Sequence, residues 1–139
     1  MKAVLQRVSA AAVRVNGQTI AQIGPGLVVL LGVGREDSED TADRLAAKIR
    51  ALRIFADNDG RMNDPVGDRE ILCVSQFTLY ADTSRGDRPG FAPAAEPQRA
   101  QALYELTCEA LHAKRGRFGA HMELELTNDG PVTIVLEVT

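Results

Sequence analysis

Apolar and polar residues follow one another along this chain in a pattern that predicts strands before any helix. Residues 2–15 are rich in Val and Ala, and Asn16-Gly17 directly after them is a strong signal for a tight hairpin turn. Residues 18–23 return as a second strand. After Gly24-Pro25-Gly26, the apolar run 27–33 has the length of a central strand. The pattern therefore predicts that the fold opens with a three-stranded meander.

Two later stretches repeat apolar residues at steps of three and four, which is typical of amphipathic helices. The first follows Ser38, a good N-cap residue, and continues to Leu52. The second starts at Glu96-Pro97 and continues to Leu111, since proline is tolerated in the first helical turn. We expect the basic residues and the glycine of Lys114-Arg115-Gly116-Arg117 to end this second helix.

The remaining segments predict short strands and loops. Residues 53–56 resemble a short strand, and the segment from there to Glu70 has too many Gly, Pro and Asp for regular structure. Residues 71–74 form an apolar run typical of a buried strand. Near the end of the chain, residues 122–127 alternate as a strand does, Asn128-Asp129-Gly130 predicts a turn, and a last strand follows.

These elements predict a single domain over residues 1–139 of the α+β class. We expect largely antiparallel, barrel-like sheets with two long helices packed on sheet faces. Two helices leave sheet surface to cover, so we also expect a homodimer. The composition, with 45% hydrophobic and 25% charged residues, is that of an ordinary globular chain.

Composition and charge narrow the partners only slightly. The formal charge of −3 neither supports nor excludes RNA, so any RNA contact needs a local basic patch. Arg7 interrupts the first apolar residues too early for a signal peptide, and no run approaches the roughly 20 apolar residues of a membrane span. We therefore expect a cytoplasmic protein with no membrane partner.

The chain offers no evident metal site or cofactor site. Cys73 and Cys108 lie in separate apolar runs, and neither belongs to a ligand cluster, so we expect two buried free thiols. The two histidines, His112 and His121, are too few and too isolated to indicate zinc. We expect an activity that needs no cofactor.

The strongest candidate for chemistry is Ser75-Gln76-Phe77-Thr78, where the buried strand ends and a long polar segment begins. Thr78 can simply be a strand-forming residue, because Thr is common in strands. Alternatively, Thr78 is a nucleophile whose base comes from elsewhere, or the motif offers backbone N–H groups to a developing oxyanion. Both functional interpretations predict an ester or amide substrate.

Three other places leave alternatives open. Arg85 and Arg88 belong either to a solvated charged loop or to a set of phosphate contacts. Arg7 either faces the core, where it must hydrogen-bond, or lies on the outer face of its strand. Gly130-Pro131 suits a hairpin turn, yet a proline at the start of an apolar strand removes a ladder donor, and the sequence does not reveal whether this bond is cis.

Four motifs together closely resemble the D-aminoacyl-tRNA deacylase family, also called D-tyrosyl-tRNA deacylase. The resemblance covers the whole chain in the same order, and also includes Gln6-Arg7-Val8 and Gly24-Pro25-Gly26-Leu27. The four motifs are Ser75-Gln76-Phe77-Thr78, the 81–89 segment, Gly116-Arg117-Phe118-Gly119-Ala120 and Asn128-Asp129-Gly130-Pro131-Val132-Thr133. Gly90 and His121, which flank these motifs, depart from the family pattern and put local tRNA contacts in doubt.

The resemblance implies an ester hydrolase that removes D-amino acids, and mischarged glycine, from tRNA as translation quality control. It implies a cytoplasmic homodimer that needs no metal. The family's catalytic motif corresponds to Ser75, Gln76, Phe77 and Thr78, and its Gly-cisPro motif corresponds to Gly130 and Pro131, which reach the other subunit's site. Arg7 would help to orient that dipeptide, and Arg85, Arg88 and Arg117 are candidate tRNA contacts.

Two other classes of function compete with this interpretation. The first is a non-catalytic RNA-binding module that uses Arg85, Arg88 and Arg117. The second is an interaction domain whose exposed sheet only dimerises. Turnover of a D-aminoacyl ester separates the enzyme from both.

Overall fold

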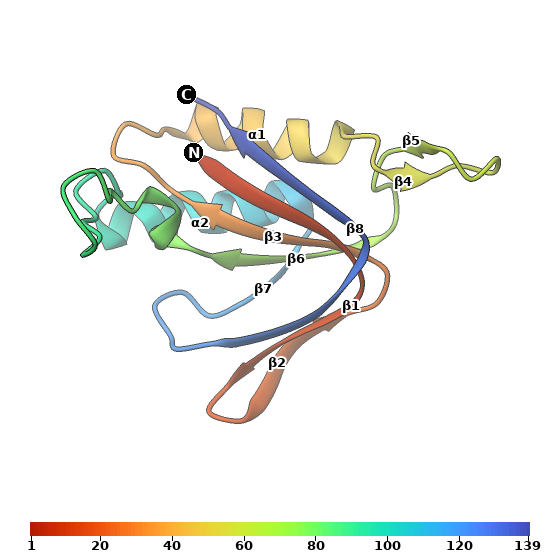
Figure 1. Cartoon of the computed structure of the whole chain (residues 1–139), viewed down its shortest axis with the longest axis horizontal. Coiled ribbons are helices and arrows are strands. Elements are labelled where there is room, and N and C mark those ends of the chain that lie inside the picture. Colours follow the sequence, from red (N-terminus) through yellow and green to blue (C-terminus); the bar gives the residue numbers. More distant parts are fainter.

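The sheet is built around its first strand. In the computed structural model, which describes residues 1–139, β1 (Lys2–Val15) pairs with β2 (Gln18–Ile23), β3 (Gly26–Gly32) and β8 (Glu123–Glu137) (Figure 1). The first half of β1 pairs with β3 and the second half pairs with β2, while β8 runs antiparallel along nearly its whole length. Three of the predicted strands are therefore present, and β1 lies between the other two.

The predicted three-stranded meander is wrong in the order of its strands. A meander would place β2 in the middle, but the order is β2-β1-β3. The physical reason is length: β1 has 14 residues and β2 only 6, so β1 extends beyond the hairpin and its free half can pair with β3.

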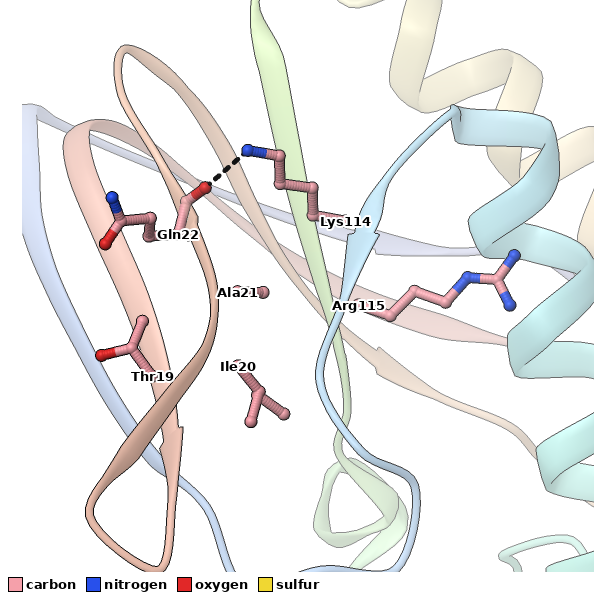
Figure 2. Close-up of a pocket in the computed structure, with 6 residues that line it drawn as sticks. All are labelled: Thr19, Ile20, Ala21, Gln22, Lys114 and Arg115. Carbon is pink, nitrogen blue, oxygen red and sulfur yellow. Dashed lines mark hydrogen bonds between the residues drawn. The ribbon is translucent and has the colours of Figure 1, made fainter.

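The sheet continues with parallel strands and curls until its edges approach. β6 (Glu70–Ser75) runs parallel to β3, and β7 (Lys114–Arg115) runs parallel to β6. Lys114 of β7 reaches across to β2, where its Nζ donates to the backbone oxygen of Gln22 at 2.9 Å (Figure 2). The barrel-like sheet is confirmed; within it, the pairs that β1 makes with β2, β3 and β8 are antiparallel as expected, whereas those of β6 with β3 and β7 are parallel.

Both helices cover the same face of the sheet. α1 (Glu39–Ala51) and α2 (Pro97–Leu111) lie beside one another and bury their apolar stripes against β1, β3 and β6 (Figure 1). Ser38 caps α1 as expected, because its side chain accepts from the Thr41 backbone N–H. Neither helix has the length and apolar character that crossing a lipid bilayer would require.

The opposite face carries a smaller core inside the curl of the sheet. Val28 and Leu72 belong to it and come from adjacent strands. Partly buried residues of β8, including Leu124 and Leu126, pack against it. Alternate side chains of β3 and β6 are therefore buried in one core or the other. Because both faces of these strands are buried, their sequences are continuous apolar runs.

The end of α2 differs from the prediction. The helix ends at Leu111, and His112 adopts a left-handed conformation with φ of 53° at the C-cap. The cap backbone N–H of His112 donates to carbonyls of the last turn, so no glycine is needed there. Lys114 and Arg115 form β7, so the expected stop at Gly116 is wrong.

The segment between α1 and β6 has more structure than its composition suggests. Besides the expected short strand, β4 (Phe55–Ala56), it contains β5 (Met62–Asp64), and the two form a small hairpin. The Asp57 carboxylate accepts backbone N–H groups of Asp59 and Arg61 within the turn. These hydrogen bonds hold the connection.

The turn predicted at Asn128-Asp129-Gly130 is also wrong, because β8 does not reverse there. Val8 pairs with Asn128 and Gln6 pairs with Thr133, so residues 129–132 form a bulge opposite Arg7. Both flanks of the bulge stay paired with β1. Residues that usually form a turn therefore form a bulge within a continuous strand here.

We predict that Gly26→Ala strongly destabilises the fold. A β-carbon at Gly26 would lie 1.8 Å from the backbone oxygen of Glu70, so β3 and β6 would have to separate. Overpacking of this kind costs roughly 1–3 kcal/mol or more. The urea midpoint should fall accordingly, while the control Gly24→Ala, whose β-carbon has its nearest neighbour at 3.8 Å, should leave it nearly unchanged. Equal midpoints for the two variants would contradict this account.

Candidate active site

The strand β6 positions the first candidate motif at its carboxyl end. Ser75 is the last residue of the strand and pairs with Leu31 of β3. The backbone N–H of Gln76 still donates to the Leu31 oxygen at 2.7 Å. The chain then turns into the single 3₁₀ turn η1 (Phe77–Tyr80). The motif thus spans the junction between a rigid strand and a short helical turn.

Within this motif, the side chains bond to one another and not to a base. The Gln76 amide Nε2 donates to the Thr78 hydroxyl at 2.5 Å. An amide cannot take a proton from that hydroxyl, so it does not activate Thr78 as a nucleophile. The backbone N–H groups of Phe77 and Thr78 belong to the first turn of η1 and donate to no acceptor of the chain.

The nearby cysteine is unsuited to nucleophilic attack. Cys73 lies two residues before Ser75 and is fully buried, as expected for a free thiol. A hydrogen bond with Cys108, together with burial, raises the pKa of the Cys73 thiol. The thiolate, which is the reactive form, is therefore disfavoured at neutral pH.

A cavity of about 630 Å³ opens beside the motif. Ser75, Gln76 and Phe77 form part of its wall, and Phe91 and Phe118 add aromatic surface from two other segments. Phe91 also packs edge-on against Phe77 with ring centroids 4.9 Å apart. Eleven of the seventeen lining residues are hydrophobic, so the cavity suits a flat or apolar group.

The three candidate tRNA contacts lie on segments that lead into this cavity. Arg85 and Arg88 are exposed on the loop that returns through Phe91, and Arg117 is exposed next to Phe118. The structure gives none of the three an ion pair with a carboxylate. Their guanidinium groups therefore remain available to an external anion.

The Arg7 side chain is largely buried and faces hydrogen-bond acceptors. Of the two orientations left open by the sequence, the structure therefore shows the inward one, in which the guanidinium must hydrogen-bond. The side chain is 16% exposed. Nε donates to the Asp129 backbone oxygen at 3.0 Å, and Nη1 donates to the Ile54 oxygen at 2.8 Å. A β-carbon at Gly130 would lie 3.0 Å from Nη2, so the bulge rests directly on the guanidinium.

A second polar contact holds the bulge from the other side. The Asn128 amide Nδ2 donates to Gln6 Oε1 at 3.0 Å and lies 3.5 Å from the Thr133 hydroxyl. The two ends of the bulge are thereby joined across the ladder. Gly130 has a φ of +130°, which disfavours any side chain, and the Gly130-Pro131 peptide bond is cis. Both residues are exposed.

The structure does not bring the two candidate motifs together within one chain. Ser75 pairs with Leu31, and Leu31 pairs with Ala3, whereas Gly130 lies opposite Arg7, four residues further along β1. With three strand spacings and four residues between them, Ser75 and Gly130 are on the order of 20 Å apart. None of the cavity-lining residues belongs to the bulge.

Sequence reasoning missed the residues that complete the cavity. The sequence marks Phe118 only as part of a motif and Met122 only as part of a strand, yet both line the cavity. The available signal was the presence of Phe91 and Phe118 in otherwise polar segments. The contact between Gln6 and Asn128 could not be predicted from the sequence. Their hydrogen bond forms only because the register of β1 and β8 brings the two side chains together.

Other parts of the molecule offer less. The hollow between β2 and β7, lined by Thr19, Ile20, Ala21, Gln22, Lys114 and Arg115, contains none of the candidate site residues (Figure 2). No group of three or more His, Cys, Asp or Glu side chains is arranged to hold a metal ion.

Comparison with known proteins gives consistent matches over the full chain. The family model described as D-Tyr-tRNA(Tyr) deacylase matches residues 4–137. D-aminoacyl-tRNA deacylase of Symbiobacterium thermophilum is 53% identical over 99% of this chain and 95% of the relative. D-aminoacyl-tRNA deacylase of Deinococcus radiodurans is 52% identical over 99% of this chain and 100% of the relative.

Two solved structures share the fold. The structure of a protein named c-Myc DNA Unwinding Element Binding Protein superimposes with a TM-score of 0.93 at 43% identity, covering 99% of this chain and 98% of the other. A probable eukaryotic D-amino acid tRNA deacylase superimposes with a TM-score of 0.84 at 16% identity, covering 97% of each chain, which supports the fold alone. The chain therefore belongs to the D-Tyr-tRNA(Tyr) deacylase family, which confirms the family and the hydrolase class expected from its four motifs.

Proposed function

We propose that this protein hydrolyses the ester bond of D-aminoacyl-tRNA, releasing the free D-amino acid and the tRNA. Mischarged glycyl-tRNA is a second substrate, since glycine has no side chain to exclude. L-aminoacyl-tRNA is rejected by the Gly-cisPro motif. The protein acts in the cytoplasm as part of translation quality control, and the reaction uses no cofactor.

The observation that carries this proposal is the strand-end motif itself. At η1, two successive backbone N–H groups have no partner in the chain, and the first of them belongs to Phe77, which lines a cavity rich in aromatic and apolar side chains. Such donors stabilise the negative charge that develops on a carbonyl oxygen during ester hydrolysis. Nothing in the motif supplies a base to Thr78.

The chemistry follows from these donors and from the substrate. The Phe77 and Thr78 N–H groups bind the oxyanion while water attacks the ester carbonyl, and the bond to the ribose oxygen breaks. The free 2′-hydroxyl of the terminal ribose lies next to the ester and assists the proton transfer that the protein does not provide. Ser75 and Gln76 hold the motif, and Thr78 binds the substrate.

Chirality is enforced by exclusion at the bulge. The backbone carbonyls of Gly130 and Pro131 face the chiral carbon of the bound aminoacyl group. An L side chain would point into this backbone, whereas the hydrogen of a D-amino acid or of glycine fits. Arg7 keeps the segment in place through its bonds to the Asp129 and Ile54 oxygens.

The two halves of the site come from different chains of a homodimer. In one chain, Ser75 and Gly130 are on the order of 20 Å apart along the sheet, so the bulge cannot reach its own motif. The sheet face around β1 and β8 also leaves Val135 73% exposed, more than the other large hydrophobic residues of the chain. A second copy of the chain covers the exposed Val135 surface and places its own bulge beside the motif at Ser75.

The terminal nucleoside of the tRNA occupies the cavity. Phe91 and Phe118 offer rings on which a base can stack. Arg85, Arg88 and Arg117 lie on the segments around it, free of carboxylate partners, and contact the phosphates of the acceptor end. Because the chain as a whole carries a charge of −3, we expect tRNA to be attracted to these arginines and not to the rest of the surface.

A second candidate function is nucleic-acid binding without turnover. It is favoured by one solved relative, whose name describes a protein that binds a DNA element. The same three arginines would serve it. The two functions differ in whether a D-aminoacyl ester is consumed catalytically.

We predict multiple turnover of D-Tyr-tRNA with L-Tyr-tRNA spared. The steric exclusion of an L side chain should make the D ester react at least on the order of 100-fold faster, since about 2.7 kcal/mol separates such rates. The measurement is release of labelled amino acid at substoichiometric protein. Stoichiometric protection of both esters would favour the binding function instead.

Thr78→Ala should weaken the reaction without abolishing it. Loss of one hydrogen bond to the substrate, worth about 1 kcal/mol, should lower kcat/KM by roughly fivefold. Thr78→Ser, which keeps the hydroxyl, is the matched control and should stay near the wild type. A loss of several orders of magnitude in Thr78→Ala, with a trapped acyl-enzyme in the parent, would make Thr78 the nucleophile.

Gly130→Val should reduce the D/L preference. The new side chain would meet Val132 at 2.9 Å and Arg7 at 3.0 Å, so the bulge would shift. Gly17→Val is the control, because Gly17 also has a positive φ but no neighbour within 4 Å. Initial rates on both enantiomers and the solution mass of each variant are measured. An unchanged preference removes the bulge from selection, and an active monomer contradicts a site shared between chains.

A further inference from the structure

The turn that carries the candidate motif is packed closely against Gly32, the last residue of β3, and against Gly34, two residues beyond the strand. A β-carbon at Gly32 would lie 3.1 Å from the Leu79 β-carbon and 3.2 Å from the Tyr80 ring. A β-carbon at Gly34 would lie 2.8 Å from both the Tyr80 Cζ and its hydroxyl oxygen. The closeness of η1 therefore requires small residues at these two positions.

A buried carboxylate connects this glycine to the tyrosine. The Asp37 Oδ2 atom accepts the Gly34 backbone N–H at 2.6 Å and lies 3.5 Å from the Tyr80 hydroxyl. Asp37 is 7% exposed, and its other oxygen accepts from the Met1 amino group at 2.7 Å. On the outer side, the Lys2 ammonium lies 4.8 Å from the centre of the Tyr80 ring. The ring is thus fixed from several directions.

The tyrosine remains a neutral donor in this setting. Burial, and then the neighbouring carboxylates of Asp37 and Glu137, raise the pKa of the Tyr80 hydroxyl. The hydroxyl therefore keeps its proton over the whole range in which a cytoplasmic enzyme works.

Tyr80 and the candidate oxyanion donors belong to the same four-residue turn. η1 contains Phe77, Thr78 and Tyr80, and a 3₁₀ turn is too short to bend independently at its two ends. On the loop side, the Phe77 ring packs against Phe91, and Phe77 is still 54% exposed. The start of η1 is joined to the sheet through β6 and the Gln76–Leu31 hydrogen bond, and the contact of Tyr80 with Gly34 secures its other end.

We propose that Tyr80, seated on Gly34 just beyond β3, is a positioning residue that fixes the Phe77 and Thr78 backbone N–H groups for deacylation. This inference rests on the proposed function. Tyr80 does not touch the reacting atoms. It acts through the orientation of η1, so the ring matters more than the hydroxyl, whose bond to Asp37 is long.

The kinetic test compares four variants with the wild type on D-Tyr-tRNA. Gly34→Ala and Tyr80→Leu should lower kcat by roughly 10- to 100-fold, as small displacements of catalytic groups do, with KM changed less than about threefold. Tyr80→Phe keeps the ring and should rescue most of kcat. Gly24→Ala is the matched glycine control. A rise in KM with kcat unchanged, or equal losses in Tyr80→Phe and Tyr80→Leu, would overturn the proposal.

A readout without catalysis keeps the inference separate from the proposed function. The backbone amide resonances of Phe77 and Thr78, and their hydrogen exchange, should change in Gly34→Ala and Tyr80→Leu, while those of α1 and β2 stay in place. Unchanged Phe77 and Thr78 amides would overturn the proposal whatever the kinetics show. If the wild type does not hydrolyse the D ester, the proposed function fails, and the amide measurements alone decide whether Tyr80 fixes η1.

Discussion

The pairing of β1 with β8 is the interaction on which the rest of this structure depends. It runs along nearly the whole length of both strands and leaves the other edge of β1 for β2 and β3. Through β3 it positions β6, and hence the motif at Ser75. Through the interruption opposite Arg7 it positions the bulge. One ladder thus sets the places of both candidate halves of the site.

The sequence predicted those elements whose signals are local. α1 has a capping residue and an apolar stripe within thirteen residues, and these suffice to define it. The order of the strands was not predictable in this way, because the neighbours of β1 are set by pairing with residues that are distant along the chain. Asn128-Asp129-Gly130 shows the same limit: its residues suit a reversal, but pairing on both sides with β1 makes it a bulge.

The candidate site divides along similar lines. The motif around Thr78 was marked by its place at the end of an apolar strand, whereas the role expected of Gly130 came only from the family resemblance. The hydrogen bonds of Arg7 answered a question that the pattern had raised. The cavity could not be predicted, since Phe91 and Phe118 are separated by a whole helix and meet only in the fold. The same holds for Tyr80, whose significance depends on a glycine just beyond another strand.

The bulge has a consequence for how this protein can change over time. Residues 129–132 stand opposite one residue of β1, and the flanking segments are paired independently on either side. An insertion or deletion within the bulge would therefore leave the register of both flanks intact, unlike the same event within a regularly paired part of β8. The segment that we propose to face the substrate's chiral carbon could therefore change in length without a shift in the paired residues on either side.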